Sequence, residues 1–453
     1  MLDERGAELE RVLIATRGPT AHRLVRFFKG LGVETVLVFG MAESEQELLD
    51  EADYASYVPG DSWEDVWLSP ERILSVAMDA GCVAIHPGSC FLAEHVPFHM
   101  NALTANVLVF GPPIQVLQHV RRREHVQKLA RSIGLNVVPH SDVLAEEDDG
   151  LEWAGRLGLP LVVRGVNGRA YELVSDYGEL AAAVGRVRQE SSLRAGCAEV
   201  YLARCVPAAR FVSTVVVGDT AGEIVELGWC DSTLELGRFA HVEECGATLL
   251  ASEVRQRLAD QARALCKELE WVGVGRVRWL LTPDGEAFLM GISARLPTGF
   301  DLVEQVHGVD LIRAQYDVAL GRKLHWIQPS GKGLGHGIQV RLYHAAVMGG
   351  GPAEGTLERL ELPDDCHVER GVDDGTVFGN DTEPLLARIT VVESDRDSAI
   401  RAIRQALEGV SVSGIPTNLE VLRGAFESEA FTGATHGPDL MERLTVDPQK
   451  QDG

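Results

Sequence analysis

The residues of this chain best suited to phosphate chemistry lie in the stretch 158–174, GLPLVVRGVNGRAYELV. Arg164 supplies a cation on the first predicted strand, and Asn167-Gly168 favours a two-residue hairpin turn because both positions tolerate positive φ. A hairpin can cover a phosphate chain when its turn is long and glycine-rich, since backbone N–H groups then surround the oxygens. This turn is short, and the arginine and tyrosine after it fill space that a phosphate needs. An ordinary surface hairpin is therefore the simpler interpretation.

Other segments rich in glycine or cysteine match no established nucleotide or metal motif. Arg17-Gly18 does not continue into G-x-G-x-x-G, and the run 330–337 does not fit G-x-x-x-x-G-K-[ST], so we interpret that run as a linker. The eight cysteines include no Cys-x-x-Cys pair, so neither a zinc site nor a redox motif is indicated. We expect buried thiols in a reducing compartment.

Composition indicates a globular protein of several domains. With 453 residues the chain exceeds what one core holds, and about three domains are expected. The net charge of −25 disfavours duplex nucleic acid and anionic membranes as partners. The N-terminus is acidic rather than signal-like, and no apolar run reaches the ~20 residues of a membrane helix. We therefore expect a cytoplasmic protein with no nucleic-acid or membrane partner.

The elements that must position these residues begin with a βαβ pattern, which predicts an α/β domain with a parallel sheet. Its predicted strands are 11–15, 33–38, 83–85 and 107–110, and its predicted helices cover 24–31 and 70–80. One helix is then expected from about 113 to 134, and a small domain that contains the hairpin from about 136 to 200.

The second half of the chain alternates between strands and helices before a polar tail at 440–453. Further strands are predicted at 200–202, 211–217, 275–281 and 287–290, with a helix at 252–270. A β-rich third domain follows, with strands at 338–343, 355–362 and 386–392 and a helix at 397–408.

In this order, these pieces resemble biotin carboxylase, the ATP-grasp component of biotin-dependent acyl-CoA carboxylases. Ile14-Ala-Thr-Arg-Gly18 is similar to the family's Ile-Ala-Asn-Arg-Gly, and further landmarks follow at 84–94, 308–312, 335–336 and 414–418. The resemblance implies an α/β fold with a Rossmann-like N-terminal domain at 1–112 and an ATP-grasp domain at 113–330, including a lid at about 136–200. It also implies a β-rich C-terminal domain at 331–445 and a tail at 446–453.

The family reaction uses ATP and bicarbonate to make carboxyphosphate and then carboxylates biotin on a carrier. Such phosphoryl transfer depends on cations and Mg²⁺ around the phosphates. Mg²⁺ requires oxygen ligands, usually carboxylates. Bicarbonate requires a cation to hold it and a base to deprotonate it.

By this resemblance, the chain departs from the family at the positions that touch ATP. Its two phosphate-contacting lysines fall at Arg123 and Arg164, and the planar guanidinium is not equivalent to an ammonium. The glycine run of the lid shortens to Gly165-Val-Asn-Gly168. The adenine hinge loses its glutamate and reads Ala203-Arg204-Cys-Val206.

The positions for metal, bicarbonate and biotin depart as well. The family's His-Gln-Lys aligns with Arg238-Phe-Ala240, although Glu243 and Glu244 remain. The metal-binding glutamates fall at Arg278 and at Met290 or Gly291. A dication is not expected beside an arginine with no compensating anion, because two unit charges ~4 Å apart repel by about 4 kcal/mol at an effective dielectric constant of about 20. The arginine that binds bicarbonate in the family is retained as Arg295. The segment Pro297-Thr-Gly299 has no residue that could act as the base, and the arginine that contacts biotin in the family falls near His367.

These departures predict a non-catalytic biotin carboxylase relative that serves as a structural or regulatory subunit of an acyl-CoA carboxylase complex. Its expected partners are an active biotin carboxylase, a biotin carrier or a carboxyltransferase, in a homo- or hetero-oligomer. No cofactor and no metal ligand are expected, and ATP and Mg²⁺ would bind only if activity is retained. The candidate residues, all at degenerate positions, are Arg295 and Arg238 for catalysis and Arg123, Arg164, Gly165, Gly168, Arg204 and His367 for ATP or biotin.

Two alternatives stay open. The chain is an active ATP-grasp ligase if Arg123, Arg164, Arg238 and Arg295 clamp phosphates while Glu243 and Glu244 hold a metal ion. Alternatively, it binds a nucleotide or another anion without turnover, as a sensor, because the arginine cluster suits an anion.

Overall fold

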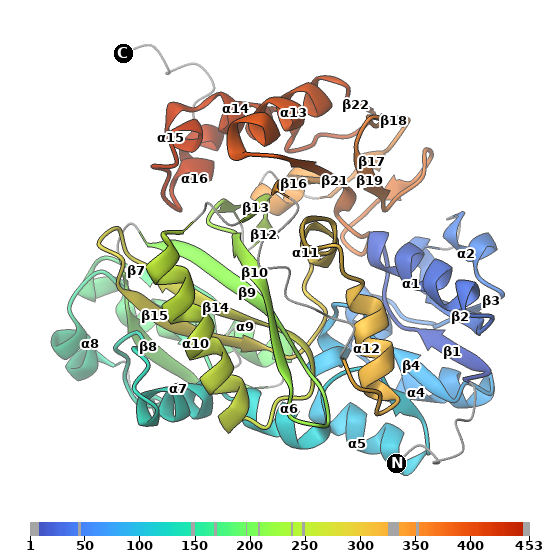
Figure 1. Ribbon diagram of the computed structural model, residues 1–453, viewed down its shortest axis with the longest axis horizontal. Coiled ribbons are helices and arrows are strands. Elements are labelled where there is room, and N and C mark those ends of the chain that lie inside the picture. Colours follow the sequence, from blue (N-terminus) through green and yellow to red (C-terminus); the bar gives the residue numbers. More distant parts are fainter. Residues whose placement is uncertain are drawn as a thin grey trace.

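The N-terminal region forms a five-stranded parallel sheet covered by helices, as the βαβ pattern predicts (Figure 1). The computed structural model describes residues 9–43, 47–145, 150–166, 170–195, 197–206, 209–236, 239–246, 250–324, 335–349 and 353–446. The sheet order is β3-β2-β1-β4-β5. Its strands are β1 (Arg11–Ile14), β2 (Glu34–Phe39), β3 (Tyr54–Tyr57), β4 (Ala84–His86) and β5 (Leu108–Val109). Its helices are α1 (Pro19–Gly30), α2 (Leu48–Glu51), α3 (Trp63–Trp67), α4 (Pro70–Asp79) and α5 (Val96–Thr104), with 3₁₀ turns η1 (Met41–Glu43) and η2 (Phe91–Glu94).

The helix predicted from 113 to 134 is two helices, α6 (Ile114–Val120) and α7 (Arg123–Ser132). Arg122 has extended backbone angles of φ −99° and ψ 110°, which end the helical path between them. Its guanidinium lies 3.3 Å from Glu199. The sequence gives no sign of this break, because neither glycine nor proline marks it.

The lid contains a three-stranded antiparallel sheet in the order β7-β6-β8. Leu161 pairs with Val174 and Arg164 with Tyr171, which confirms the predicted hairpin strands. The turn residues 167–169 lie outside the described residues. The lid elements are α8 (Leu151–Leu157), β6 (Leu161–Gly165), β7 (Tyr171–Val174), η3 (Tyr177–Glu179), α9 (Leu180–Ala195) and β8 (Val200–Arg204).

One eight-stranded antiparallel sheet, in the order β15-β14-β9-β10-β13-β16-β21-β19, joins the central and C-terminal parts of the chain. Its strands are β9 (Arg210–Gly218), β10 (Ile224–Asp231), β13 (Val242–Gly246), β14 (Gly273–Leu281), β15 (Ala287–Ser293), β16 (His336–Tyr343), β19 (His367–Arg370) and β21 (Leu385–Glu393). Short strands form three further pairs, β11 (Glu235–Leu236) with β12 (Phe239–Ala240), β17 (Gly355–Thr356) with β20 (Val377–Phe378), and β18 (Arg359–Glu361) with β22 (Ser411–Ser413).

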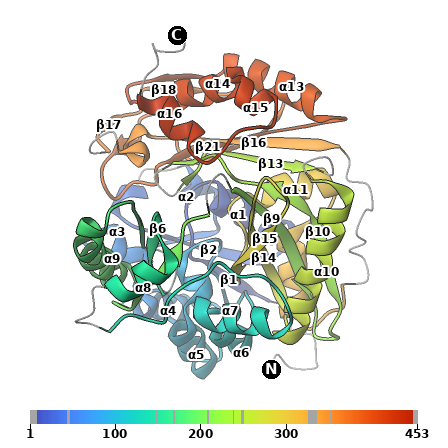
Figure 2. The ribbon, with the colours of Figure 1, turned by 90° about the vertical axis from the view of Figure 1, so that its left-hand side faces the viewer.

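Helices cover this sheet and complete its cores. They are α10 (Ser252–Glu268), α11 (Phe300–His307), α12 (Leu311–Ala319), η4 (Ala345–Met348), α13 (Arg396–Glu408), α14 (Leu419–Glu427), α15 (Glu429–Thr432) and α16 (Leu440–Val446). Figure 2 shows α13, α14, α15 and α16 together on one side of β16 and β21. Phe28 of α1, Phe110 and Tyr316 of α12 pack ring against ring, which fixes the N-terminal domain to the centre of the molecule.

Two expectations for the C-terminal region are wrong. The strand predicted at 355–362 is divided between β17 and β18, because the two halves pair with different partners, β20 and β22. The polar tail predicted from 440 begins as α16, in which Leu440 and Met441 are buried against the C-terminal core. Residues 447–453 lie outside the described residues.

Candidate ligand cavity between the lid and the central sheet

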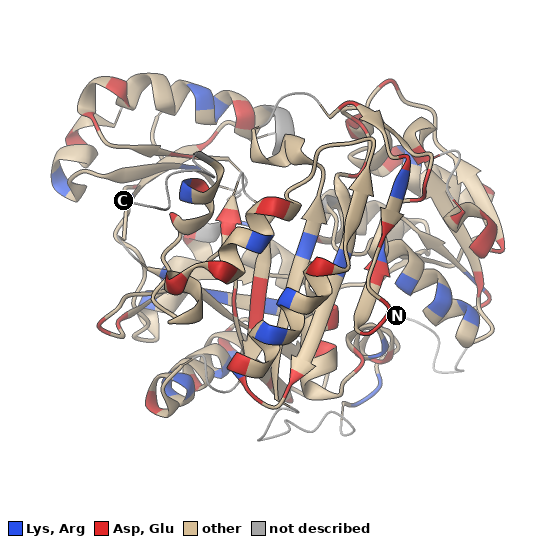
Figure 3. Cartoon of the chain, turned by 90° about the horizontal axis from the view of Figure 1, so that it is seen from above, with Lys and Arg blue, Asp and Glu red and all other residues tan. Residues whose placement is uncertain are grey.

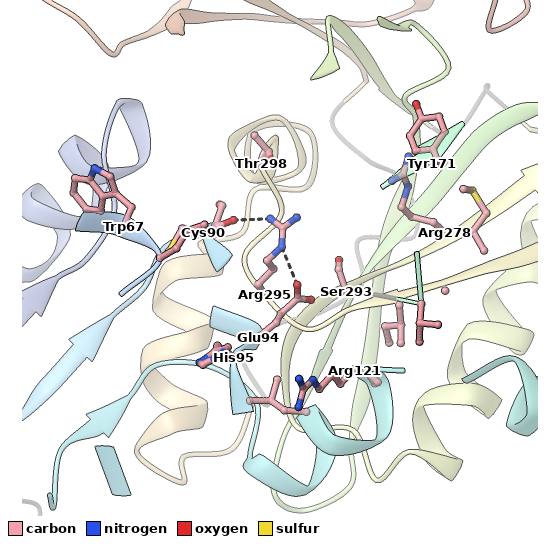
Figure 4. A pocket seen from close by; sticks show the side chains of 18 of the residues that line it. Trp67, Cys90, Glu94, His95, Arg121, Tyr171, Arg278, Ser293, Arg295 and Thr298 are labelled. Carbon is pink, nitrogen blue, oxygen red and sulfur yellow. Dashed lines mark hydrogen bonds and ion pairs between the residues drawn. The ribbon is translucent and has the colours of Figure 1, made fainter. Parts of the chain in front are cut away.

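A cavity of about 1380 Å³ lies where the N-terminal domain, the lid and the central sheet meet (Figure 4). Arg164, Arg278 and Arg295, which the sequence places in different segments, all line it. Of the other candidates, Gly168 and Arg238 lie outside the described residues, and only the backbone of Arg123 is described, at the start of α7. The structure therefore brings the candidate arginines Arg164 and Arg295 around one space with Arg278, whereas Arg204 does not line it.

The charges around this cavity are nearly balanced. Its arginines are Arg17, Arg121, Arg122, Arg164, Arg278 and Arg295, and its acidic residues are Glu94, Glu190, Glu199, Glu235 and Glu383. Ion pairs join Arg17 to Glu383 at 2.9 Å, Arg122 to Glu199 at 3.3 Å, Arg278 to Glu235 at 2.8 Å and Arg295 to Glu94 at 3.3 Å. Figure 3 likewise shows basic positions interspersed with acidic ones along the chain. A triphosphate favours an excess of positive charge, which the described part of this lining does not supply.

Arg278 takes the place that the resemblance assigns to a metal-binding glutamate. It stands on β14 directly opposite Gly291 of β15, the other predicted metal position. Its guanidinium donates a hydrogen bond of 2.8 Å to Glu235. The nearest carboxylate is thus already neutralised by a fixed cation, and a dication here would meet the charge of Arg278.

Arg295 links the central sheet to the N-terminal domain. It donates a 2.7 Å hydrogen bond to the carbonyl oxygen of Ser89, and its Nε lies 3.3 Å from Glu94 (Figure 4). The same Glu94 also accepts a 2.7 Å hydrogen bond from the backbone of Ala294. Arg295 is therefore in the cavity, as expected from the sequence, and it holds two domains together.

The position expected for the catalytic base is closed by a buried ion pair. Gly299 has room for no larger residue, since a β-carbon there would lie 2.5 Å from both Arg341 and Glu243. Those two side chains form an ion pair at 2.5 Å. A glutamate at this position would require the pair to move.

Glu243 and Glu244, the carboxylates that the ligase alternative assigns to a metal ion, are buried and fully engaged. Glu243 lies 2.6 Å from Arg276 as well as contacting Arg341, and Glu244 lies 2.9 Å from His336 and 2.7 Å from Arg396. Burial alone would raise the pKa of Glu244, but hydrogen bonds from His336 and Arg396 lower it to about 2. The metal role expected in that alternative does not fit these contacts.

The lid backbone offers few donors to a phosphate chain. The N–H of Gly165 donates to the carbonyl of Ala170, and the N–H of Val166 donates to Glu199. The guanidinium of Arg164 lies 5.4 Å from the centre of the Tyr171 ring. The first bond closes the hairpin and the second joins the end of β6 to the residue before β8, so these two N–H groups form no donor nest on the described side of the turn.

The hinge is packed rather than open to a ligand. Ala203 is buried in one apolar cluster with Tyr201, Leu280 and Met290. The N–H of Arg204 donates to Pro139 across the hinge, while its side chain is exposed. The hinge thus presents apolar surface where an adenine-binding protein needs polar groups.

His367 does not line the cavity. It lies on β19, where its ring nitrogen is 3.6 Å from Glu369, and a ligand atom of Asp301 is close enough for the three to surround a metal ion. Arg388 pairs with both acids and Arg23 lies 3.2 Å from Glu369, so two fixed cations already occupy this cluster. The site assignment expected for His367 is therefore not reproduced at the cavity.

Sequence reasoning missed the buried arginines Arg276 and Arg341. Arg276 is 9% exposed and Arg341 is 3% exposed, and both contact Glu243. A signal was present, because Arg276 and Arg278 alternate within an otherwise apolar strand. Charged residues inside such a strand are rare unless they are paired.

The fold and the cavity define a protein of the ATP-grasp class. Residues 8–117 match the family model for the biotin carboxylase N-terminal domain, residues 339–443 the model for its C-terminal domain, and residues 122–327 the model for the carbamoyl-phosphate synthase L chain ATP-binding domain. The chain belongs to the biotin carboxylase family.

Relatives support this assignment over nearly the whole chain. A biotin carboxylase of Halalkalibacterium halodurans is 26% identical over 428 residues, which cover 93% of this chain and 95% of that protein. The mitochondrial methylcrotonoyl-CoA carboxylase subunit alpha of Rattus norvegicus is 27% identical over 440 residues; the match covers 95% of this chain but only 62% of that longer protein.

Solved structures show the same fold. The biotin carboxylase domain dimer of Hydrogenobacter thermophilus 2-oxoglutarate carboxylase, in complex with MgADP, ADP and bicarbonate, superposes with a TM-score of 0.90 at 24% identity. The superposition covers 96% of this chain and 98% of that one. None of the helices in the described ranges has the length and apolar character that a membrane span requires.

Proposed function

We propose that this chain is a non-catalytic biotin carboxylase-like subunit of a biotin-dependent acyl-CoA carboxylase complex. The observation that carries the proposal is the ion pair between Arg278 and Glu235, opposite Gly291. The resemblance assigns metal-binding glutamates to position 278 and to position 290 or 291. In this chain the first is an arginine in a neutral ion pair, and the second is a methionine or a glycine. The domain division that goes with this proposal is 1–112, 113–330 and 331–445.

The electrostatics of the cavity support inactivity. Mg²⁺ requires oxygen ligands, and a carboxylate that is already paired with an arginine is a poor one. Two like unit charges ~4 Å apart repel by about 4 kcal/mol at an effective dielectric constant of about 20. The closed base position at Gly299 and the engaged carboxylates Glu243 and Glu244 point the same way.

A structural role fits the parts that remain intact. The chain supplies its own domain contacts, since Arg295 ties the central sheet to Ser89 and Glu94. Similar proteins include chains named as subunits, such as the biotin-dependent acyl-coenzyme A carboxylase alpha3 subunit of Mycobacterium leprae. We propose that this chain assembles with an active biotin carboxylase, a biotin carrier or a carboxyltransferase.

Copurification tests the proposed assembly. The full chain, tagged at its natural expression level, is isolated under low-salt conditions and its companions are identified by mass spectrometry. The proposal expects at least one biotin-dependent carboxylase subunit at a fixed ratio to the chain. Elution of the chain without any such subunit contradicts the proposal.

Anion binding without turnover is a second candidate, favoured by Arg121. This residue lines the cavity, and among the described residues no ion pair engages it. A rise in melting temperature with pyrophosphate or ADP tests this candidate. Arg121→Ala should abolish the rise, whereas Arg131→Ala, on the exposed surface of α7, should preserve it.

A further inference from the structure

Two buried cysteines face each other across neighbouring strands beneath α11. Cys230 of β10 and Cys245 of β13 are directly paired in the antiparallel register, and they are 1% and 0% exposed. Residues opposite each other in such a ladder have Cα atoms about 4.5–5.5 Å apart, and disulfides span Cα separations of about 4.4–6.8 Å. All eight cysteines fall in the described ranges, and no disulfide joins any two of them. The register therefore presents a reduced pair that a disulfide can link without backbone movement.

An imidazole completes this cluster. The Nε2 atom of His307, at the end of α11, lies 3.9 Å from the Sγ atom of Cys245. The opposing backbone is shaped to admit the ring, because a β-carbon on Gly228 would lie 2.0 Å from His307 Nε2 and Gly228 has φ +55°. A register shift between Leu227 and Cys230 accompanies this glycine. The β-bulge thus makes room for His307 and returns Cys230 to its place opposite Cys245.

The two thiols have unequal acidity. The pKa of Cys245 is lowered to about 6, mainly by the hydrogen bond from Cys230 and to a lesser extent by the neighbouring His307. Burial opposes this shift. Burial raises the pKa of Cys230 instead, and burial without such neighbours raises the pKa of Cys266 well above its ordinary value. One member of the pair is therefore suited to be a thiolate nucleophile and the other to be a protonated partner.

Both sulfurs are buried, and His307 is the side from which we expect a small oxidant to reach them. The ring of His307 and the carboxylate of Glu226 on that side are only partly buried, and the Sγ atom of Cys245 lies 3.9 Å from the ring. Glu226 accepts a 2.8 Å hydrogen bond from Thr214 and places a negative charge near the imidazole. This arrangement excludes bulky reagents more strongly than it excludes a molecule the size of hydrogen peroxide.

We propose that Cys245 and Cys230 form an oxidation site for hydroperoxides, with Cys245 as the attacking thiolate and Cys230 as the resolving thiol. The thiolate sulfur of Cys245 attacks one peroxide oxygen, the O–O bond breaks, and the departing hydroxide takes the proton of the His307 imidazolium to become water, which leaves His307 neutral. Cys230 gives its proton to His307 and attacks the resulting sulfenic acid. The S–O bond breaks, hydroxide leaves and recovers that proton, and a disulfide forms. Two thiols are oxidised, and one peroxide is reduced to two waters.

Peptide mapping tests this proposal in the full chain. Trypsin cuts after Arg210, Arg238 and Arg255, so Cys230 and Cys245 fall in the separate peptides 211–238 and 239–255, each with one cysteine. The folded protein is treated with a stoichiometric amount of hydrogen peroxide, unfolded, alkylated and digested. We expect the linked peptide pair 211–238/239–255 to be the main oxidation product and to disappear on reduction. The proposal is overturned if Cys230 and Cys245 are both still alkylated, and were therefore still reduced, when other thiols of the chain have been oxidised.

Variants separate the two roles. In Cys230→Ser, a sulfenic acid on Cys245 should persist and be trapped by dimedone on peptide 239–255. His307→Gln should slow oxidation of Cys245 about tenfold or more, while Cys266→Ala should leave the rate unchanged. An equal oxidation rate in His307→Gln and the parent chain contradicts the role of the imidazole. Circular dichroism of each variant confirms that it is folded, and the mapping of the parent chain stands independently of the variants.

Discussion

The guanidinium of Arg278 lies 2.8 Å from a carboxylate oxygen of Glu235. This ion pair joins β14 to β11, and its two residues are 43 positions apart in the sequence. It places a fixed positive charge at a position that the resemblance assigns to a metal-binding glutamate. The ion pair between Arg278 and Glu235 is the main reason to propose that the chain is a non-catalytic subunit.

Restoring carboxylates should restore affinity for a divalent ion. The double variant Arg278→Glu with Gly291→Glu puts two acids opposite each other on β14 and β15, near Glu235. We expect Mn²⁺ to bind this variant at least about tenfold more tightly than the parent chain, which corresponds to ~1.4 kcal/mol. Electron paramagnetic resonance titration measures the free ion. Arg263→Glu on α10 is the matched control, and equal Mn²⁺ affinity in all three proteins contradicts the interpretation.

Glu243 should be a major determinant of stability. Glu243→Gln leaves Arg276 and Arg341 buried with no compensating anion, and removal of one partner from a buried ion pair costs about 3–5 kcal/mol. Glu235→Gln breaks a pair that is 23–35% exposed and should cost less than about 1 kcal/mol. Urea unfolding gives both free energies. A loss at Glu243 no larger than the loss at Glu235 would refute this prediction.

Acid should destabilise the fold through Glu244. Its pKa is about 2 in the folded chain against an ordinary value of 4.5, so the unfolded chain binds more protons between these values. The contribution is present above pH 4.5 and is lost as the pH falls towards 2, and it amounts to roughly 3 kcal/mol. The unfolding free energy measured between pH 6 and pH about 2.5 should therefore fall more gently in Glu244→Gln. Parallel pH profiles of variant and parent would show that Glu244 is not responsible.

The general fold and part of the cavity could be predicted from sequence. The parallel sheet and the hairpin pairing of Leu161 with Val174 follow from local periodicity and turn chemistry, which act over short distances. The gathering of Arg164, Arg278 and Arg295 followed from the resemblance.

The partners of these arginines could not be predicted. Glu235, Glu94 and Glu199 reach their cations only through long-range packing, which sequence periodicity does not encode. The prediction of one helix across Arg122 failed for the same reason. The guanidinium of Arg122 contacts Glu199 of the lid, and no local breaker residue marks the end of the helix. The metal role of Glu243 in the ligase alternative does not fit the structure, because Glu243 is paired with the buried Arg276 and Arg341. The burial of these arginines is a tertiary property that the sequence does not reveal.

Mg-nucleotide should not stabilise the chain. A ligand that binds only the folded state raises the melting temperature, and at a hundred times its dissociation constant the gain is about 2.7 kcal/mol. We expect no rise with millimolar MgATP or MgADP in differential scanning fluorimetry. A catalytic biotin carboxylase measured in parallel should show the rise. A magnesium-dependent rise in this chain, absent with nucleotide alone, runs against the predicted loss of the metal cradle.

Bicarbonate-dependent release of ADP from MgATP is the most direct test of inactivity. The purified full chain is assayed with biotin present, and the inactive-site variant Arg295→Ala serves as the background. The account predicts that the parent chain and Arg295→Ala release ADP at the same rate, with no response to bicarbonate. A rate that rises with bicarbonate and falls to background in Arg295→Ala would show that the chain is an active ligase.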